Sequence, residues 1–238
     1  MIEAKHVSKW FDGQRVLYDI NATFDTGKTN LIIGQSGSGK TVFMKCLIGL
    51  LTPEEGEILY DGRKFRDLDN QHKRQLRTEI GMLFQGSALF DTETVLGNVM
   101  FPLKMFSNMS RAEQLERAHF CIKRVGLEKA DDKYPSEISG GMQKRVAIAR
   151  ALVNDPVLIL ADEATGNLDT RTSFSILTLF QEFHSRGRTI VFVTHNPELA
   201  QYSSRNIVLR DGKIISDTYN DNPLSAREAH EKLPKEND

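Results

Sequence analysis

The fold is decided by the stretch Gly34-Gln35-Ser36-Gly37-Ser38-Gly39-Lys40-Thr41, which comes directly after the apolar run Leu31-Ile32-Ile33. Its spacing follows the phosphate-binding loop pattern G-x-x-x-x-G-K-(S/T). The glycines let the chain curl so that successive backbone N–H groups point at the oxygens of a nucleotide triphosphate. A loop rich in glycine and serine can match this pattern by accident, but here a predicted strand precedes it and a predicted helix over residues 42–50 follows it. The sequence therefore predicts a strand, a phosphate-binding loop and a helix in that order.

The residues of this loop have distinct expected contacts with the nucleotide. Lys40 is expected to reach the β- and γ-phosphates, and the Thr41 hydroxyl to bind Mg²⁺. The helix that begins here would point its positive end at the anion. The residues predicted to bind the nucleotide at this end of the chain are Gly34, Ser36, Gly37, Ser38, Gly39, Lys40, Thr41 and Val42.

Length, charge and cysteine content narrow the class of protein. With 238 residues the chain is long enough for a complete core and is expected to form one domain. Its 31 lysines and arginines and 32 aspartates and glutamates leave a net charge of −1, so bulk charge predicts no nucleic acid partner. Cys46 and Cys121 lie in predicted helices without C-x-x-C spacing, which favours buried thiols over a disulfide or a zinc site.

The chain is not expected to cross a membrane by itself. Its first six residues lack the charged-then-apolar order of a signal peptide, and its longest apolar runs, such as 157–161 and 190–193, are short. A membrane-spanning helix needs about 20 apolar residues. If the protein serves a membrane process, another chain must cross the bilayer.

The first 155 residues divide into a strand-rich part and a helical part. Strands are predicted at 2–7, 16–20 and 31–33, with a turn at 10–13 and a hairpin at Asp61-Gly62 after the run 57–60. This part is expected to be an antiparallel β subdomain. Residues 86–155 are predicted to form an inserted helical subdomain. Within it, Ser110 and Glu113 form a capping-box pattern, and Gly126 ends the helix that they begin.

From residue 157 onward, predicted strands alternate with predicted helices, which indicates parallel pairing through right-handed crossovers. The strands are placed at 157–161, 189–193 and 206–209, the helices at 172–184 and 197–203, and a last hairpin at 210–213. The domain is expected to span residues 1–216. Residues 217–238 are predicted to be a polar tail, mostly solvated or disordered, with one short helix over 223–232.

Two acids end the apolar strand Val157-Leu158-Ile159-Leu160-Ala161. Asp162, at the strand end, is placed to hold Mg²⁺ directly or through water. Glu163, one residue further, would polarise a water for attack on the γ-phosphorus. The alternative reading is an acidic cap on the segment that follows.

The stretch Ile138-Ser139-Gly140-Gly141-Met142-Gln143-Lys144-Arg145-Val146 resembles the signature motif of ATP-binding-cassette (ABC) proteins. Ser139, Gly140 and Gly141 at a helix N-terminus make a second anion site, whose amides and dipole favour a γ-phosphate. The resemblance covers roughly residues 2–215. It implies an α/β fold of the P-loop NTPase class, the ABC ATPase fold, with a mixed sheet core, an antiparallel β subdomain and an inserted helical subdomain.

The resemblance also assigns expected roles to single residues. Phe11 stands where the family has an aromatic that stacks on adenine, and Val16 is expected beside the base. Trp10 is the competing stacking candidate, and either ring could instead belong to the core. Gln85 matches the glutamine that senses Mg²⁺ and couples to the membrane partner in this family. Asp169 lies in the loop Gly166-Asn167-Leu168-Asp169, which resembles the loop that links two active sites across a dimer. His195 matches the switch histidine that contacts the γ-phosphate.

Two positions depart from the family pattern. Met142 stands where a glutamine usually follows the two glycines, which puts any role of that side chain in doubt. Ala164 replaces a proline that is common after the catalytic glutamate, and leaves a less rigid entry to the next loop. Neither departure removes a catalytic atom.

The resemblance implies a sandwich dimer in which the phosphate loop of one copy and the signature of the other close on each ATP. Catalysis would then come from Glu163, His195 and Lys40, with ATP and Mg²⁺ as the ligands. The expected partners are a second ATPase subunit, identical in the simplest case, and integral-membrane permease subunits. The chain is expected at the cytoplasmic face of the inner membrane, held there through those subunits.

Two stretches point to different relatives within the family. Residues 81–91, followed by Val95, Asn98-Val99 and Phe101-Pro102-Leu103, resemble Mla-type ATPases that move phospholipids between bacterial membranes. Residues 161–169 are similar to ATPases of lipoprotein release, macrolide efflux and cell division. The first stretch touches the membrane subunit in this family, so it favours lipid trafficking, with an extracytoplasmic lipid-binding protein as a further partner. The alternatives are an exporter ATPase, a regulatory ATPase that drives an extracytoplasmic hydrolase, and a soluble ATPase with no membrane partner.

Overall fold

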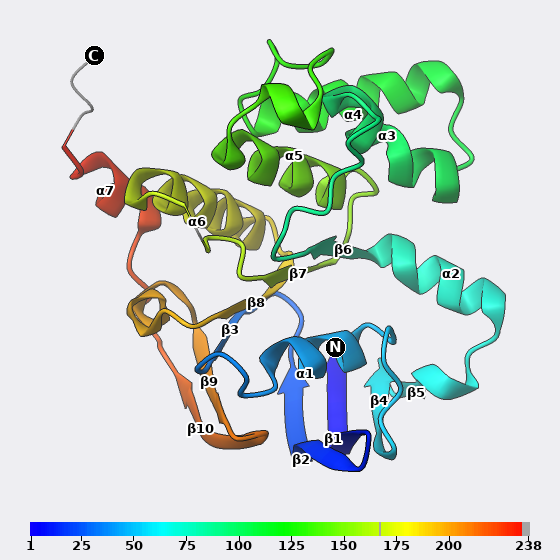
Figure 1. The fold of residues 1–238 in the computed structure, drawn as a ribbon, viewed down its shortest axis with the longest axis vertical. Coiled ribbons are helices and arrows are strands. Elements are labelled where there is room, and N and C mark those ends of the chain that lie inside the picture. The colour runs from blue at the N-terminus through cyan, green and yellow to red at the C-terminus, as the bar shows by residue number, and fades with distance from the viewer. Residues whose placement is uncertain (167, 235–238) are drawn as a thin grey trace.

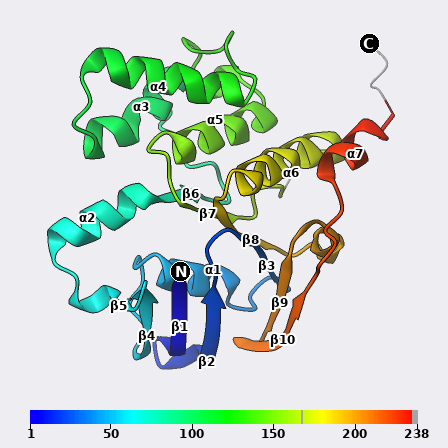
Figure 2. The same ribbon diagram turned by 180° about the vertical axis from the view of Figure 1, so that it is seen from behind.

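Two β-sheets meet in the computed structural model, which describes residues 1–166 and 168–234 (Figures 1 and 2). The smaller sheet is antiparallel, with the order β2-β1-β4-β5. Its strands are β1 Ile2–Phe11, β2 Gln14–Phe24, β4 Glu55–Tyr60 and β5 Arg63–Lys64. The larger sheet has the order β10-β9-β3-β8-β7-β6 and is mixed, because only β10 runs antiparallel. Its strands are β3 Thr29–Ile33, β6 Ile80–Leu83, β7 Leu158–Asp162, β8 Thr189–Thr194, β9 Arg205–Arg210 and β10 Lys213–Tyr219.

The central strands of the larger sheet explain why their sequences are continuous apolar runs. Every residue of β3, β7 and β8 is buried. A parallel strand with helices on both faces has no solvated side, so it shows no alternation of polar and apolar residues. Because β3, β7 and β8 run parallel, the loops that follow their carboxyl ends lie at one edge of the sheet. Ligands bind at this edge in open α/β folds.

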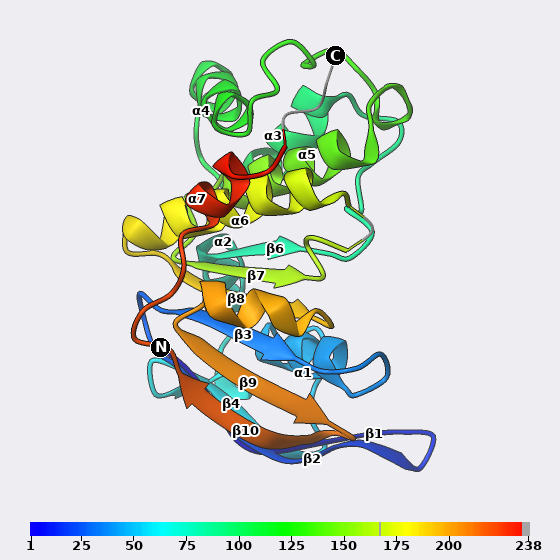
Figure 3. The same ribbon diagram turned by 90° about the vertical axis from the view of Figure 1, so that its left-hand side faces the viewer.

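The helices lie in layers on the two faces of this sheet. Figure 3 shows α3, α4 and α5 furthest from the small sheet, then α6, then the large sheet, with α1 on its other face. The bounds are α1 Lys40–Leu47, α2 Asn70–Glu79, α3 Val95–Phe106, α4 Arg111–Arg124, α5 Gly140–Leu152, α6 Thr170–Ser185 and α7 Ala226–Glu231. Short 3₁₀ turns occupy Phe65–Asp67, Pro135–Glu137 and Pro197–Tyr202. The architecture is the predicted ABC ATPase type, whereas the boundaries 1–216 and 86–155 stay predictions.

Several element boundaries differ from those predicted. The turn expected at 10–13 is confined to Asp12-Gly13, because β1 continues through Trp10 and Phe11 and pairs with β2. The first helix begins at Lys40, two residues earlier than predicted. The segment 197–203 forms a 3₁₀ turn instead of an α-helix. Helix α2 was not predicted at all, since Leu76 is its only buried residue and gives no apolar periodicity.

The described part of the predicted tail is more ordered than expected. Strand β10 runs to Tyr219, and the short helix α7 packs on α6 with Ala226 fully buried. The Gln181 side chain accepts a hydrogen bond from the Ala226 N–H at 2.8 Å, and Arg227 pairs with Glu182 at 2.7 Å. Asn167 and residues 235–238 lie outside the described residues. Among residues 1–166 and 168–234, no helix combines the length and apolarity that crossing a bilayer requires.

Candidate functional site

Three loops meet where β3, β7 and β8 end. The Gly34 N–H donates to the Thr194 carbonyl at 3.3 Å, and the Glu163 N–H donates to the Val193 carbonyl at 2.9 Å. The end of β8 is thus bonded on one side to the start of the phosphate loop and on the other to the acidic pair after β7. The predicted phosphate loop, the predicted acids and His195 consequently share one edge of the sheet.

The backbone of the phosphate loop needs glycine at three points, one of which is Gly37 with a φ of +80°. A side chain on Gly34 would place its Cβ 2.2 Å from the Leu209 carbonyl oxygen of β9 and 2.5 Å from Ser38 Oγ. Gly39 has a φ of +98°, a conformation that favours glycine, and ends the loop directly before α1. No side chain caps α1, so the N–H groups of its first turn stay available to an anion.

The Lys40 ammonium lies inside the curl of the loop. Its Nζ donates to the carbonyl oxygens of Gly34 at 2.7 Å and Gln35 at 2.8 Å. Burial lowers the pKa of Lys40, although the Glu163 and Asp162 carboxylates favour its charged form. The ammonium is therefore held in place by backbone oxygens beside the acidic pair, a position from which it can reach phosphate.

Oxygen donors suited to Mg²⁺ stand next to this lysine. Thr41 Oγ1 donates to Asp162 Oδ1 at 3.3 Å. Burial raises the pKa of Asp162, while the bond from Thr41 lowers it. Ser38 Oγ is buried and has no hydrogen-bond partner among the described residues. An orphaned hydroxyl inside the loop and two hard oxygens beside it fit a phosphate with its Mg²⁺, which proteins bind through few side chains.

Two of the predicted site residues, Gln85 and His195, contact the predicted catalytic residue Glu163. Gln85 Nε2 donates to Glu163 Oε2 at 2.8 Å, and His195 Nδ1 lies 3.3 Å from Glu163 Oε1. Two side chains from two other loops thus share the Glu163 carboxylate. Gln85 makes no direct hydrogen bond to Thr41 or Asp162 among the described residues, so its predicted role as a metal ligand stays a prediction.

The predicted signature lies away from the chain's own phosphate loop. Ser139 caps α5, accepting from the Met142 N–H at 3.3 Å, and a Cβ on Gly141 would lie 3.2 Å from Thr172 of α6. Asp169 caps α6, accepting from the N–H of the same Thr172 at 2.8 Å. The Thr172 hydroxyl also donates to Asp169, and these bonds lower the pKa of that carboxyl. Ser139, Gly140, Gly141 and Asp169 therefore form a second group at adjacent helix N-termini.

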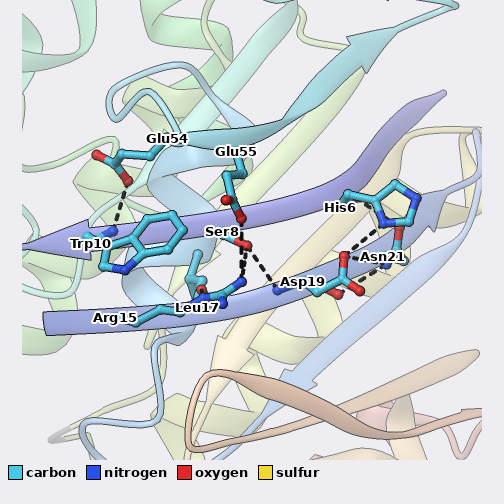
Figure 4. A network of polar contacts seen from close by, with 9 residues as sticks. All are labelled: His6, Ser8, Trp10, Arg15, Leu17, Asp19, Asn21, Glu54 and Glu55. Carbon is cyan, nitrogen blue, oxygen red and sulfur yellow. Dashed lines mark hydrogen bonds and ion pairs between the residues drawn. The ribbon is translucent and has the colours of Figure 1, made fainter.

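The two aromatic candidates for adenine stacking differ in their surroundings. Trp10 is half-buried, its backbone N–H donates to Glu54 Oε2 at 2.8 Å, and the Arg15 guanidinium lies 4.7 Å from the centroid of its ring (Figure 4). Phe11 is 41% exposed at the end of β1 and has only the Lys9 ammonium over its ring. Phe11 is therefore the more exposed of the two rings. Val16 reaches the phosphate loop, because its carbonyl oxygen would lie 3.2 Å from a Cβ on Gly39.

The two residues that depart from the family pattern both contact the main core. Ala164 is buried in the main core, where it packs without a proline ring. Met142 packs against the same core as a partly buried residue. One contact near the site was not predicted: Lys144 Nζ donates to the Gln85 carbonyl and, at 3.4 Å, to the Phe84 carbonyl. The sequence signal for this contact is a lysine among apolar residues on the buried face of α5, because a buried lysine needs polar partners.

Comparisons with known proteins agree with this geometry. The family model described as ABC transporter matches residues 17–166. The chain is 39% identical over 220 residues to an uncharacterized ABC transporter ATP-binding protein of Methanocaldococcus jannaschii, covering 90% of this chain and 98% of that protein. It is also 39% identical over 217 residues to the methionine import ATP-binding protein MetN of Clostridium tetani, covering 91% of this chain and 68% of that protein.

Two further similarities concern a longer protein and a solved structure. The macrolide export ATP-binding/permease protein MacB of Pectobacterium atrosepticum is 42% identical over 203 residues, which cover 85% of this chain and 31% of that protein. A dimeric ATP-binding cassette solved in a post-hydrolysis state with ADP and Pi matches with a TM-score of 0.85 and 36% identity, covering 92% of this chain and 98% of that chain. The site geometry and these similarities together show that the chain belongs to the ABC transporter family and is an ATPase that uses ATP with Mg²⁺.

Proposed function

We propose that this ATPase drives phospholipid trafficking through separate membrane subunits, with Glu163 as the group that activates water. The observation that carries the catalytic assignment is the shared carboxylate, held by Gln85 at 2.8 Å and His195 at 3.3 Å. A carboxylate fixed from two sides can orient a water and accept its proton. His195, directly after β8, is proposed to hold the γ-phosphate.

The phosphate loop would bind the rest of the triphosphate. Lys40 is proposed to leave the Gly34 and Gln35 carbonyls and bind the β- and γ-phosphates. Thr41, Asp162 and Gln85 are proposed to hold Mg²⁺, which would neutralise charge on the phosphate oxygens when bound. Catalysis then depends mainly on position and charge, as expected for phosphoryl transfer.

The second anion-binding element is proposed to act on another copy of the chain. No hydrogen bond of the described residues joins Ser139, Gly140 or Gly141 to the phosphate loop. These residues, with Asp169, would therefore complete a site in trans. A dimeric cassette of the same fold, solved with ADP and Pi, supports this arrangement.

The membrane partner is proposed to dock in an apolar groove of about 300 Å³ between β6, α3 and α5. Phe90 and Phe101 lie in it, 40% and 37% exposed, with ring centroids 4.5 Å apart. Exposed paired aromatics are typical of interaction sites. Much of this groove is lined by residues of 81–91 and 95–103, the stretch that resembles lipid-trafficking ATPases. If the groove selects the membrane partner, this resemblance supports a partner of the lipid-trafficking type.

A second candidate is an exporter of the macrolide type, favoured by the 42% identity to the export protein MacB. Purification of the chain from membranes in mild detergent, with identification of the copurifying membrane chain, separates the two. The isolated complex is expected to transfer fluorescent phospholipid between vesicles in an ATP-dependent way. Efflux of a macrolide without lipid transfer would support the exporter, and full activity with no membrane chain would exclude both.

A further inference from the structure

The connection between β6 and α3 contains strained backbone next to Gln85. Ser87 and Ala88 have φ values of +59° and +48°, the left-handed region that residues with a side chain rarely adopt. The Ser87 N–H donates to the Phe84 carbonyl at 3.1 Å, and the Ala88 N–H to the Gly86 carbonyl at 2.6 Å. Such a turn persists only where its surroundings hold it.

Two cations of α5 hold this turn through its carbonyl groups. Lys144 Nζ donates to the carbonyls of Gln85 and Phe84. Arg150 Nη1 donates to the Ala88 carbonyl at 2.7 Å, and its Nη2 donates to the Ser87 carbonyl at 2.7 Å. Four carbonyls of a five-residue segment thus accept from one helix.

The hydrogen bonds to these carbonyls are the main polar contacts of the Lys144 ammonium and of the Arg150 guanidinium. Lys144 is only 5% exposed, and burial lowers the pKa of Lys144 and of Arg150. No carboxylate of the described residues lies within ion-pair distance of either group. Backbone oxygens therefore replace water around the buried Lys144 ammonium and the half-buried Arg150 guanidinium, which makes loss of the contacts costly for the helix as well as for the turn.

We propose that Lys144 and Arg150 form a carbonyl clamp, a pair of positioning residues that sets where Gln85 stands relative to Glu163. The clamp holds the Gln85 backbone from α5, and the Gln85 side chain donates to Glu163 at 2.8 Å. Because α5 also carries Ser139 at its N-terminus, the clamp links the second anion site to the catalytic carboxylate.

The clamp also borders the docking groove, which is lined in part by Phe84, Ala88 and Arg150. A membrane segment seated there would press directly on the clamped turn. This step rests on the proposed function: the membrane partner would change ATP turnover by moving Gln85 through the clamp. The clamp itself requires no partner.

The test measures ATP turnover by the purified full-length chain. Lys144→Met keeps the approximate length of the side chain and removes its hydrogen-bond donors. If Gln85 is displaced as a result, kcat should fall by up to about a hundredfold. The KM for ATP should stay unchanged, because the phosphate loop is untouched. Lys144→Arg restores donors and should recover most of kcat. Lys123→Met, at an exposed lysine of α4, is the matched control and should match the parent.

A double-mutant cycle separates positioning from general destabilisation. In a Gln85→Ala background, Lys144→Met should cost no further kcat, because the clamp acts through Gln85. Should Lys144→Met fail to fold, Arg150→Lys, at a half-buried residue, retains one donor and enters the same cycle. Parental kcat in the folded variants, or losses that add to that of Gln85→Ala, would overturn the clamp.

The failure of the clamp and the failure of the proposed function give different results. Non-additive loss in the isolated chain with no copurifying membrane chain would keep the clamp and reject the partner. A partner that stimulates the parent and the clamp variants by the same factor would show that coupling bypasses the clamp.

Discussion

Glu163 combines an unusual backbone with a shared side chain. Its φ of +46° lies in the left-handed region, and its N–H is tied to β8 through the Val193 carbonyl at 2.9 Å. A non-glycine residue in this region costs free energy of about 1–3 kcal/mol, and such residues cluster at active sites. In this conformation the carboxylate contacts Gln85 and His195.

The role of Glu163 predicts a separation of binding from turnover. Glu163→Gln preserves shape but removes the proton acceptor, so ATP hydrolysis should fall by about a hundred- to ten-thousandfold. ATP affinity should be retained, because the residues of the phosphate loop are unchanged. A nucleotide-bound dimer should accumulate, which size-exclusion chromatography with ATP would detect. Hydrolysis at the parental rate would show that another group activates water.

The environment of Cys46 predicts an inert thiol. The side chain is 1% exposed, and burial raises its pKa to about 12. The reactive thiolate is then roughly a thousandfold scarcer at pH 8 than in the unfolded chain. A disulfide reagent should modify Cys46 rapidly only in denaturant. Because the folded-state pKa is the raised one, this group's contribution to stability is present at neutral pH and is lost as the pH rises toward 12. Rapid modification under native conditions would contradict the buried position.

At the scale of elements, the loop between β3 and α1 is shaped by β9 as well as by its own sequence. A Cβ on Gly34 would lie 2.2 Å from the Leu209 carbonyl, which belongs to the backbone and cannot rotate away. Gly34→Ala should therefore displace the loop and abolish binding of a fluorescent ATP analogue. Gly86→Ala is the matched control, since an added Cβ there meets nothing within 4 Å. Equal affinity in both variants would show that the loop tolerates displacement.

The elements that sequence alone could predict are those with a local signal. The capping box of Ser110 and Glu113 is present at the start of α4, with the Ser110 N–H donating to Glu113 at 2.7 Å. Helix α2 was not predicted because its single buried residue, Leu76, gives no apolar periodicity, although Asp69 caps the helix. The clamp contacts of Lys144 join residues about 60 positions apart. Local patterns carry no information on such a pairing, which tertiary packing decides.

At the scale of the whole molecule, the two groups proposed to bind anions are not joined by any hydrogen bond among the described residues. The phosphate loop lies at the end of β3, whereas Ser139 and Asp169 begin α5 and α6. The helices that carry the second group pack in the same core as β3, with Val146, Ile148 and Ile176 buried in one cluster with Leu31 and Ile33. Closing both groups on one nucleotide within one chain would require this core to rearrange. In the proposed dimer, association of two copies would bring them together without that cost.

Mixing two inactive variants tests this arrangement directly. Lys40→Ala removes the phosphate-loop cation, and Gly140→Asp, where an added Cβ meets nothing within 4 Å, places a negative charge in the second group. Neither variant alone should hydrolyse ATP. A mixed dimer pairs the intact phosphate loop of one chain with the intact second group of the other. An equal mixture should therefore regain roughly a quarter of parental turnover for two-fold dimers with independent sites. If the mixture stays as inactive as its components while mixed dimers form, the site is completed within a single chain.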